Sequence, residues 1–320
     1  ALEYYEKALA IYEKIYGLSD DKVATAYTNM GILYSKMELF GDAILNLEKA
    51  LKIRKQAHGD DHTSVAIVLS ALGITYNQMG ESTTGIEFLE KALSVYRKTY
   101  GNKHPEIAST LNQLGYIYIK EETYKKAIES FHQAIIANTI DYNSTDIYSL
   151  PSIEANYYNG DYLLNSLQQK AKAFEAYHYG QTLKLKDLQV GLSYIELSDR
   201  LIDKLRQQKT TENDKIKLGN TATEVYEDGI RLSLAMADVS WAKKDLYKKA
   251  FYFSEKSKSA VLLDAIAETN AKSFANIPDD LLVKEQELKT EIAYYQQQLA
   301  AKPDKSKEET IRKTLFEYNN

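Results

Sequence analysis

A glycine returns every 42 residues in the first part of this chain, followed each time by apolar residues and a tyrosine. The glycines are Gly31, Gly73 and Gly115. A fixed period of this length means that each unit is one supersecondary element, which cannot bury its apolar face alone and packs on its neighbours to do so. The period therefore predicts a repeat protein, and repeat proteins point toward binding rather than chemistry.

Other positions keep the same period and indicate that the repeating unit is helical. Small residues recur in two further series: Ala8, Ala50, Ala92 and Ala134, and Gly17, Gly59 and Gly101. The 320 residues include only four prolines, and they are rich in residues that favour long helices. We expect the repeating glycines to sit inside helices, where they allow close contact with a second helix. They are not phosphate-binding loops, because no strand precedes them.

A second helical pattern lies between the glycines, at residues 40–50 and again at residues 124–134. The order of Leu-Gly, a tyrosine three residues further on, an alanine, an apolar residue and another alanine resembles the tetratricopeptide repeat. The usual unit has about 34 residues, so the longer period implies longer helices and linkers, similar to the repeats of kinesin light chains and of many bacterial regulatory proteins. The resemblance implies an all-α fold, a right-handed α-solenoid of helix pairs.

The period divides the chain into three predicted regions. Residues 1–140 form a regular array that starts in the middle of a repeat, with full repeats at about 24–58, 66–100 and 108–140. The expected next glycine is Tyr157, so residues 141–270 are interpreted as degenerate helix pairs. Residues 271–320 are interpreted as a helical connector, in which the apolar spacing predicts a C-terminal hairpin of two antiparallel helices. A chain that opens in mid-repeat without a methionine is interpreted as a fragment of a longer protein.

The end of the array carries a second resemblance. Residues 250–264 and 274–282 are similar to the last repeat and the connector that precede a CHAT domain, a caspase-like peptidase fold. The resemblance implies that the chain is the sensing or regulatory arm of a larger CHAT-type protein. The catalytic His and Cys of that family would lie beyond Asn320, so no catalytic residue is assigned within the chain.

Composition excludes several classes of function. The formal net charge is −5 and the pI is about 5.7, so the chain lacks the basic footprint of a nucleic-acid-binding protein. No apolar run approaches the roughly 20 residues that cross a bilayer, so no membrane partner is expected. The sequence has no cysteine, which excludes disulfides and thiolate metal sites and fits a cytoplasmic location. No motif indicates a cofactor.

The strongest candidate for chemistry is the stretch from His58 to His62, which also contains Asp60 and Asp61. Two imidazoles and two carboxylates could hold zinc. However, Asp20 and His104 occupy the position of His62 in the neighbouring repeats, so a helix cap or turn explains the stretch better. We therefore expect no metal site.

No nucleophile stands beside a base, and no carboxylate pair stands out. His132 and His178 are isolated on apolar helices and are interpreted as packing or surface residues. The sequence therefore predicts no catalytic residues, and we interpret the protein as not being an enzyme. The alternative hypothesis is an enzyme that uses these residues.

The better candidate is a binding groove. In the tetratricopeptide family, the first helix of each repeat faces the concave side with motif positions two, five, nine and twelve. Here these positions are Thr25, Thr28, Ile32, Ser35, Ile67, Ser70, Ile74, Asn77, Ser109, Asn112, Tyr116 and Ile119. The set is neutral and mostly hydrogen-bonding, with an apolar residue or tyrosine at every ninth position.

Such a surface suits an extended or helical peptide of a protein partner. Because no cation stands at the positions where chaperone co-factors clamp a C-terminal carboxylate, such a tail is not expected to bind. Two alternatives stay open: a solvated face with no ligand, and a self-assembly module that oligomerises through other surfaces. The sequence does not predict the oligomeric state.

Overall fold

The structure is a computed structural model that describes residues 2–209, 212–274 and 305–318, together with single positions between 284 and 298. The chain divides into two compact units. Unit 1 comprises Ala1–Thr99 and Phe274–Asn320, and unit 2 comprises Tyr100–Ser273.

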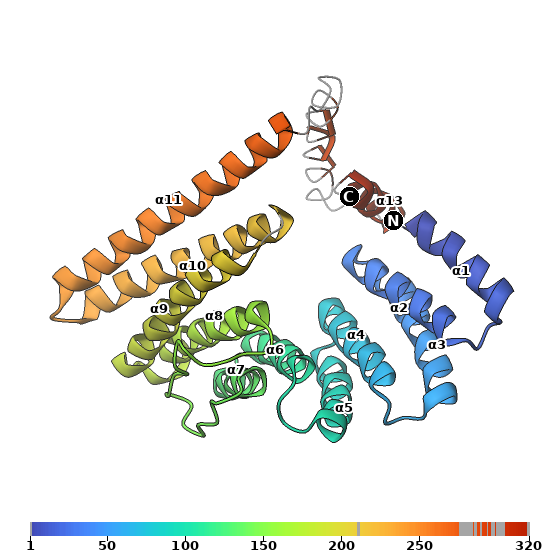
Figure 1. Cartoon of the computed structure of the whole chain (residues 1–320), viewed down its shortest axis with the longest axis horizontal. Helices are drawn as coiled ribbons and strands as arrows, with labels where there is room; N and C mark the ends of the chain where they lie inside the picture. The colour runs from blue at the N-terminus through green and yellow to red at the C-terminus, as the bar shows by residue number, and fades with distance from the viewer. Residues whose placement is uncertain are drawn as a thin grey trace. The chain divides into compact units, whose positions relative to one another are not determined.

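Unit 1 consists of helices joined by short linkers (Figure 1). Its helices are α1 (Leu2–Tyr16), α2 (Asp21–Lys36), α3 (Phe40–His58), α4 (Thr63–Met79), α5 (Ser82–Tyr100, whose last residue belongs to unit 2) and α13 (Lys305–Tyr318). The helix α2 packs on α1, α3 and α4. The core between them contains Val23, Leu47 and Leu72, each with no exposed surface.

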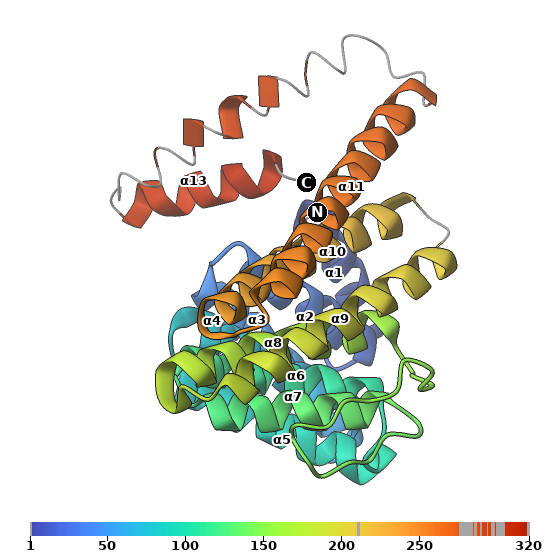
Figure 2. The same cartoon turned by 90° about the vertical axis from the view of Figure 1, so that its left-hand side faces the viewer.

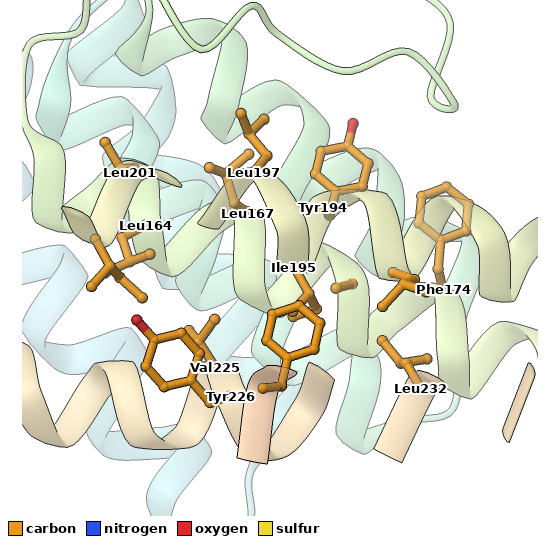
Figure 3. Close-up of a cluster of buried hydrophobic side chains, with 14 of the residues drawn as sticks. Leu164, Leu167, Phe174, Tyr194, Ile195, Leu197, Leu201, Val225, Tyr226 and Leu232 are labelled. Carbon is orange, nitrogen blue, oxygen red and sulfur yellow. The ribbon is translucent and has the colours of Figure 1, made fainter. Parts of the chain in front are cut away.

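Unit 2 contains the last regular repeat and then helices that become longer along the chain. They are α6 (Pro105–Lys120), α7 (Tyr124–Asn138), α8 (Gly160–Tyr177), the π-helical turn η1 (His178–Thr182), α9 (Leu185–Gln208), α10 (Glu212–Val239) and α11 (Lys243–Phe274). The helix α8 contacts α6, α7, α9 and α10. Side chains from α8, α9 and α10, including Leu164, Ile195 and Val225, point toward one another in the core (Figure 3).

Between α7 and α8 lies an irregular connecting segment, residues 139–159, which appears as a loop beside α7, α8 and α9 (Figure 2). Thr139 and Tyr157 form an isolated antiparallel bridge that closes its ends. Several of its apolar side chains, including Ile147 and Leu150, pack against the core of unit 2. The segment lies where the 42-residue period is lost, at Tyr157.

The repeating glycines lie at close helix contacts, as the sequence predicts. A Cβ atom at Gly31 would come within 2.6 Å of Leu47, and one at Gly73 would come within 2.7 Å of Leu89. Each pair joins the first helix of a repeat to its second helix. Glycine at these positions therefore sets the distance between the two helices.

The same contact recurs in the degenerate region with a longer spacing. A Cβ atom at Gly229 on α10 would come within 2.6 Å of Phe253 on α11. These residues are 24 apart in the sequence, whereas Gly115 and Phe131, in the last regular repeat, are 16 apart. The α10–α11 pair therefore keeps the glycine contact of the regular repeats with eight more residues between the two positions.

The all-α fold class is confirmed, and the only bridge found in the described residues is the isolated one at Thr139. The helix α11 continues through the predicted boundary at residue 270 and ends at Phe274. The helix α13 lies where the second helix of the C-terminal hairpin was predicted. Most of the first helix of that hairpin, and most of the stretch at 274–282, fall outside the described residues.

Candidate functional site

In unit 1, the predicted groove positions divide into exposed and buried groups. Ile32 on α2 is 37% exposed and Ile67 on α4 is 45% exposed, although both side chains are apolar. Thr25 is also exposed. Thr28 and Ser35 are buried, at 3% and 6% exposure, so their hydroxyls are not offered to a ligand in this conformation.

The buried groove positions of α2 make hydrogen bonds within the protein. The Thr28 hydroxyl donates to the carbonyl oxygen of Ala24 at 2.7 Å. Ser35 Oγ donates to Gln78 Oε1 at 2.6 Å and accepts from Thr75 Oγ1 at 3.1 Å. Because Thr75 and Gln78 belong to α4, Ser35 ties two successive first helices together.

The helix α4 carries a different arrangement. Ser70, Ile74 and Asn77 are partly buried and lie on one face, because they are spaced four and three residues apart. Ser70 Oγ and Asn77 Oδ1 make no hydrogen bond with another described residue. Polar oxygens without a protein partner are usually satisfied by water or a ligand. Both oxygens are themselves buried, so, like the hydroxyls of Thr28 and Ser35, they are not offered to a ligand in this conformation.

In unit 2, two groove positions hold helices together. Ser166 Oγ on α8 donates to Asn112 Oδ1 at 2.9 Å, and both side chains are buried. Asn165 Nδ2 donates to the Tyr116 hydroxyl at 2.5 Å. Burial raises the pKa of the Tyr116 phenol. Asn112 and Tyr116 thus attach α6 to α8, while Ser109 and Ile119 remain partly exposed.

A charged cluster continues this first-helix face from α8 to α10. The carboxylate of Asp228 is almost fully buried and accepts from Gln168 Nε2 at 2.9 Å and from Arg231 Nη2 at 2.8 Å. Arg231 also forms a bidentate pair with Glu175, with N–O distances of 2.8 and 2.7 Å. Bidentate geometry makes such pairs strong and directional.

Sequence reasoning missed this cluster because the residues that it joins across α8 and α10 are 56 or more positions apart, after the period has been lost. The available signal was weak. Asp228 and Arg231 are three residues apart on α10, so they lie on one face, and the same is true of Lys172 and Glu175 on α8.

The His58 to His62 stretch acts as a helix cap, which confirms the structural interpretation. His62 Nδ1 accepts a hydrogen bond from the backbone N–H of Ser64 at the start of α4. Asp20 caps α2 and His104 caps α6 in the same way, one repeat before and one repeat after. The ring of His58 stacks on that of His62.

His132 is not isolated, although the sequence suggested that it was. It is 1% exposed on α7, and its Nδ1 atom lies 2.7 Å from Nζ of Lys170 on α8. Burial and the charge of Lys170 lower the pKa of His132 to about 4. The structure instead confirms the packing interpretation for His178, which is 6% exposed and whose Nδ1 lies 2.9 Å from the carbonyl oxygen of Lys184.

The described part of the chain meets the requirements of neither a metal site nor a membrane-spanning helix. No group of three or more His, Cys, Asp or Glu residues is arranged there to hold a metal ion. None of the described helices is long and apolar enough to cross a membrane. Lys170 is a possible nucleophile by its amine alone, but it has no exposed surface.

Residues 1–56 and 64–135 match the family model described as tetratricopeptide repeat. The array in this part of the chain therefore consists of tetratricopeptide repeats. Among curated proteins, no significant match was found. No catalytic family is indicated.

Several solved structures are similar to the chain. BtubC (BKLC) from P. vanneervenii has 16% identity and a TM-score of 0.51, over 65% of this chain and 74% of that one. A Podosopora anserina protein described as a kinesin light chain with nearly identical TPR-like repeats has 16% identity and a TM-score of 0.48, over 73% and 95%. The Rap conjugation gene regulator of plasmid pLS20, in complex with the Phr* peptide, has 15% identity and a TM-score of 0.42, over 81% and 69%. At these identities the likeness concerns the fold alone.

Proposed function

We propose that the chain is a protein-binding scaffold whose repeats hold an extended or helical peptide on their first-helix faces. The observation that carries the proposal is the exposure of Ile32 and Ile67, two apolar side chains on adjacent first helices of unit 1. Thr25, which is exposed on the same helix as Ile32, adds a polar group. An apolar anchor with a few polar groups is the usual composition of a peptide site.

The remaining groove positions have different roles in this proposal. Thr25 and Ile74 in unit 1, and Ser109 and Ile119 in unit 2, have partly or fully exposed surface and belong to the proposed ligand-binding set. Thr28, Ser35 and Asn112 are buried, so they support the helices that present the others.

The experiment is selection of peptides from a displayed random library on the purified chain. Peptides that bind the wild type are then measured against Ile32→Asp and Ile67→Asp, which place a charge on the proposed apolar anchors. The matched control is Leu45→Asp, because Leu45 is 51% exposed but lies on the second helix α3. Loss of binding in the first two variants with retention in the control supports the groove. Equal binding by all variants would show that the first-helix face of unit 1 is not the site.

We also propose that this scaffold is the sensing or regulatory arm of a larger CHAT-type protein. The proposal rests on the resemblance of residues 250–264 to the repeat before such a domain. The parent sequence beyond Asn320 tests it directly, since a caspase-like domain with a catalytic His and Cys must be encoded there. Any other domain at that place would contradict it.

Self-assembly is the second candidate function, and exposed apolar side chains favour it. On α1, Tyr4, Ile11 and Ile15 are 77%, 55% and 63% exposed, and Trp241 beyond α10 is fully exposed. Light scattering over a concentration series tests the candidate. A monomer at every concentration would exclude it, whereas an oligomer that dissociates in an Ile11→Ser, Ile15→Ser double variant would place the contact on α1.

A further inference from the structure

A lysine with no exposed surface lies at the centre of unit 2. Lys170 projects from α8, and its Nζ atom lies 2.7 Å from His132 Nδ1 on α7 and 2.8 Å from the hydroxyl of Tyr194 on α9. Buried lysines are rare unless they are paired with an acid. Lys170 forms no ion pair with any described residue, so its partners are a ring nitrogen and a phenol.

Two carbonyl groups of the connecting segment fix the direction of every hydrogen bond in this cluster. His132 Nε2 lies 2.7 Å from the carbonyl oxygen of Ser144, so Nε2 carries the proton and donates. Its Nδ1 atom must then accept from Lys170. The Tyr194 hydroxyl donates to the carbonyl oxygen of Ser149 at 2.5 Å, so its oxygen also accepts from Lys170.

These directions match a neutral amine. A neutral lysine has two N–H groups, and both are used, one toward His132 and one toward Tyr194. A charged lysine has a third N–H group, for which the described residues offer no further hydrogen-bond acceptor at Nζ. The rings of Tyr194 and Phe174, with centroids 4.6 and 5.9 Å from Nζ, are the only other groups that face it in the described part of the chain. Protonation of His132 instead would turn Nδ1 into a donor that faces the donors of Lys170. The hydrogen bonds of this cluster are therefore satisfied when Lys170 and His132 are both neutral. Protonation of either residue adds an N–H donor that has no hydrogen-bond acceptor in the cluster.

This cluster binds the middle of the connecting segment, whereas Lys103 Nζ donates to the carbonyl oxygens of Thr139, Ile140 and Tyr142 at its start. The carbonyl groups of Ser144 and Ser149 are bound by His132 and Tyr194, and the Tyr142 hydroxyl donates to the same Ser149 carbonyl at 2.7 Å. We propose that Lys170, His132 and Tyr194 form an acid-sensitive latch, which holds the connecting segment against α7, α8 and α9 and releases it as the pH falls.

The charged and titratable groups around the latch support this direction. Burial lowers the pKa of Lys170 to about 6, and the carboxylate of Asp146 in the connecting segment opposes this shift. Burial, and then the positive charge that Lys170 carries once it is protonated, lowers the pKa of His132 to about 4. Burial raises the pKa of Tyr194, and Tyr142 and Asp146 raise it further. Burial also raises the pKa of Tyr142, so both phenols remain neutral at neutral and acidic pH.

Release exposes both bases to water, where each regains its ordinary affinity for a proton. Lys170 then gains a proton on opening at any pH between its folded pKa and its ordinary pKa of 10.5, and His132 gains one between pH 6.5 and about 4. The opening equilibrium should therefore increase by up to about tenfold for each pH unit as the pH falls from 8 to 6. Below that range His132 extends the effect.

Native-state hydrogen exchange of the whole chain tests the latch. The amides of Ile140 and Tyr158 report on the segment, because they donate to the carbonyl groups of Asn156 and Asn138. After correction for intrinsic exchange rates, wild-type opening should rise steeply from pH 8 to pH 6, whereas Lys170→Met should remove the slope. Lys172→Met is the matched control, because Lys172 is a partly exposed lysine on the same helix that pairs with Asp228, and it should keep the slope.

A Lys170→Met variant with the wild-type slope, or a wild type without one, would overturn the proposal. If Lys170→Met does not fold, nitrogen NMR of the wild-type His132 ring decides the question. The latch requires a neutral ring with its proton on Nε2 at pH 6. A ring that becomes charged near pH 6.5 while the segment stays protected contradicts it.

Discussion

Gly115 on α6 lies against the ring of Phe131 on α7, so closely that a Cβ atom at position 115 would come within 2.5 Å of the ring. The neighbouring ring carbon would be at 2.6 Å. Phe131 has no exposed surface and belongs to the core of unit 2, so the ring cannot move toward solvent without opening that core. The fit depends on the hydrogen atom that glycine alone provides.

Gly115→Ala should therefore destabilise the protein by about 1–3 kcal/mol, the usual cost of forcing an additional group into a packed core. Chemical denaturation measures this as a lower midpoint. Gly41→Ala is the control, because Gly41 is helical and a Cβ atom there would meet nothing within 4 Å. The control should be neutral or stabilising by up to about 1 kcal/mol, since alanine favours helices. Equal effects of the two substitutions would argue against the close contact.

The sequence predicts the features that the 42-residue period repeats. The glycine contacts at Gly31, Gly73 and Gly115 follow from one pattern, and so do the caps at His62 and His104. Each such position recurs in several repeats, so a substitution in one repeat leaves the pattern recognisable in the others. The fold class and the boundaries of the first helix pairs could therefore be predicted with little information beyond the spacing.

The polar clusters of unit 2 could not be predicted in this way. Lys170 and His132 are 38 residues apart and lie on either side of the connecting segment, whose length no periodicity sets. The motif also does not predict which groove positions are exposed. Ser35 and Ile119 both occupy the twelfth position of the motif, yet Ser35 is buried and Ile119 is partly exposed. Exposure depends on the neighbouring helix, which the motif does not encode.

The buried carboxylate of Asp228 provides a second prediction. It accepts hydrogen bonds from Gln168 and Arg231 and lies 3.3 Å from Lys172. Asp228→Asn removes the charge that offsets Arg231 and Lys172, whose side chains are 50% and 32% exposed. Because these cations remain in contact with water, the change should cost about 1–3 kcal/mol, the usual cost of hydrogen bonds lost at a buried group. The free energy of unfolding measures the effect.

Asp245→Asn is the matched control for Asp228→Asn. Asp245 pairs with Lys248 at 3.2 Å, but both side chains are more than two-thirds exposed. Exposed pairs contribute between 0 and about 1 kcal/mol, so this variant should be nearly neutral. A similar small loss in Asp228→Asn would indicate that the buried cluster adds little to stability.

Asn138 provides a third prediction, because its side chain fixes the start of α8. Its Nδ2 donates to the carbonyl oxygen of Asn159 at 2.6 Å, and its Oδ1 accepts from the N–H of the same residue at 3.0 Å. Arg54 occupies the equivalent position 84 residues earlier, which is two periods of 42, and donates to the carbonyl oxygen of Ser64 at the start of α4. A side chain from the C-terminal part of a second helix thus anchors the next first helix in both units.

Asn138→Ala should destabilise the protein by about 1–3 kcal/mol, because it leaves the N–H of Asn159 without a partner. The carbonyl oxygen of Asn159 keeps only its hydrogen bond from the N–H of Leu163. Asn143→Ala is the control, since Asn143 lies in the connecting segment and is exposed. Hydrogen exchange at the first turn of α8 should increase in Asn138→Ala and remain unchanged in Asn143→Ala. Unchanged exchange in both variants would show that the start of α8 does not depend on this side chain.

The buried imidazole of His132 predicts how stability depends on pH. Burial, and then the charge of Lys170, lowers its pKa from 6.5 to about 4 in the folded chain. Between these values the unfolded chain binds a proton that the folded chain does not, so the free energy of unfolding falls as the pH falls, by up to about 1.4 kcal/mol for each pH unit. Above pH 6.5 the histidine contributes no slope, and below about pH 4 its contribution is complete.

Urea denaturation of wild type and His132→Phe between pH 7 and pH 4 isolates this contribution from that of the carboxylates, which both proteins share. The variant should be less stable at pH 7, because Lys170 loses a hydrogen-bond acceptor. It should also lose less stability on acidification, so that the two curves converge toward pH 4. His58→Gln, which removes an imidazole at the surface, should follow the wild-type slope. Parallel curves for wild type and His132→Phe would mean that His132 binds its proton equally well in the folded and unfolded chains, and that the burial of its ring does not control the response to acid.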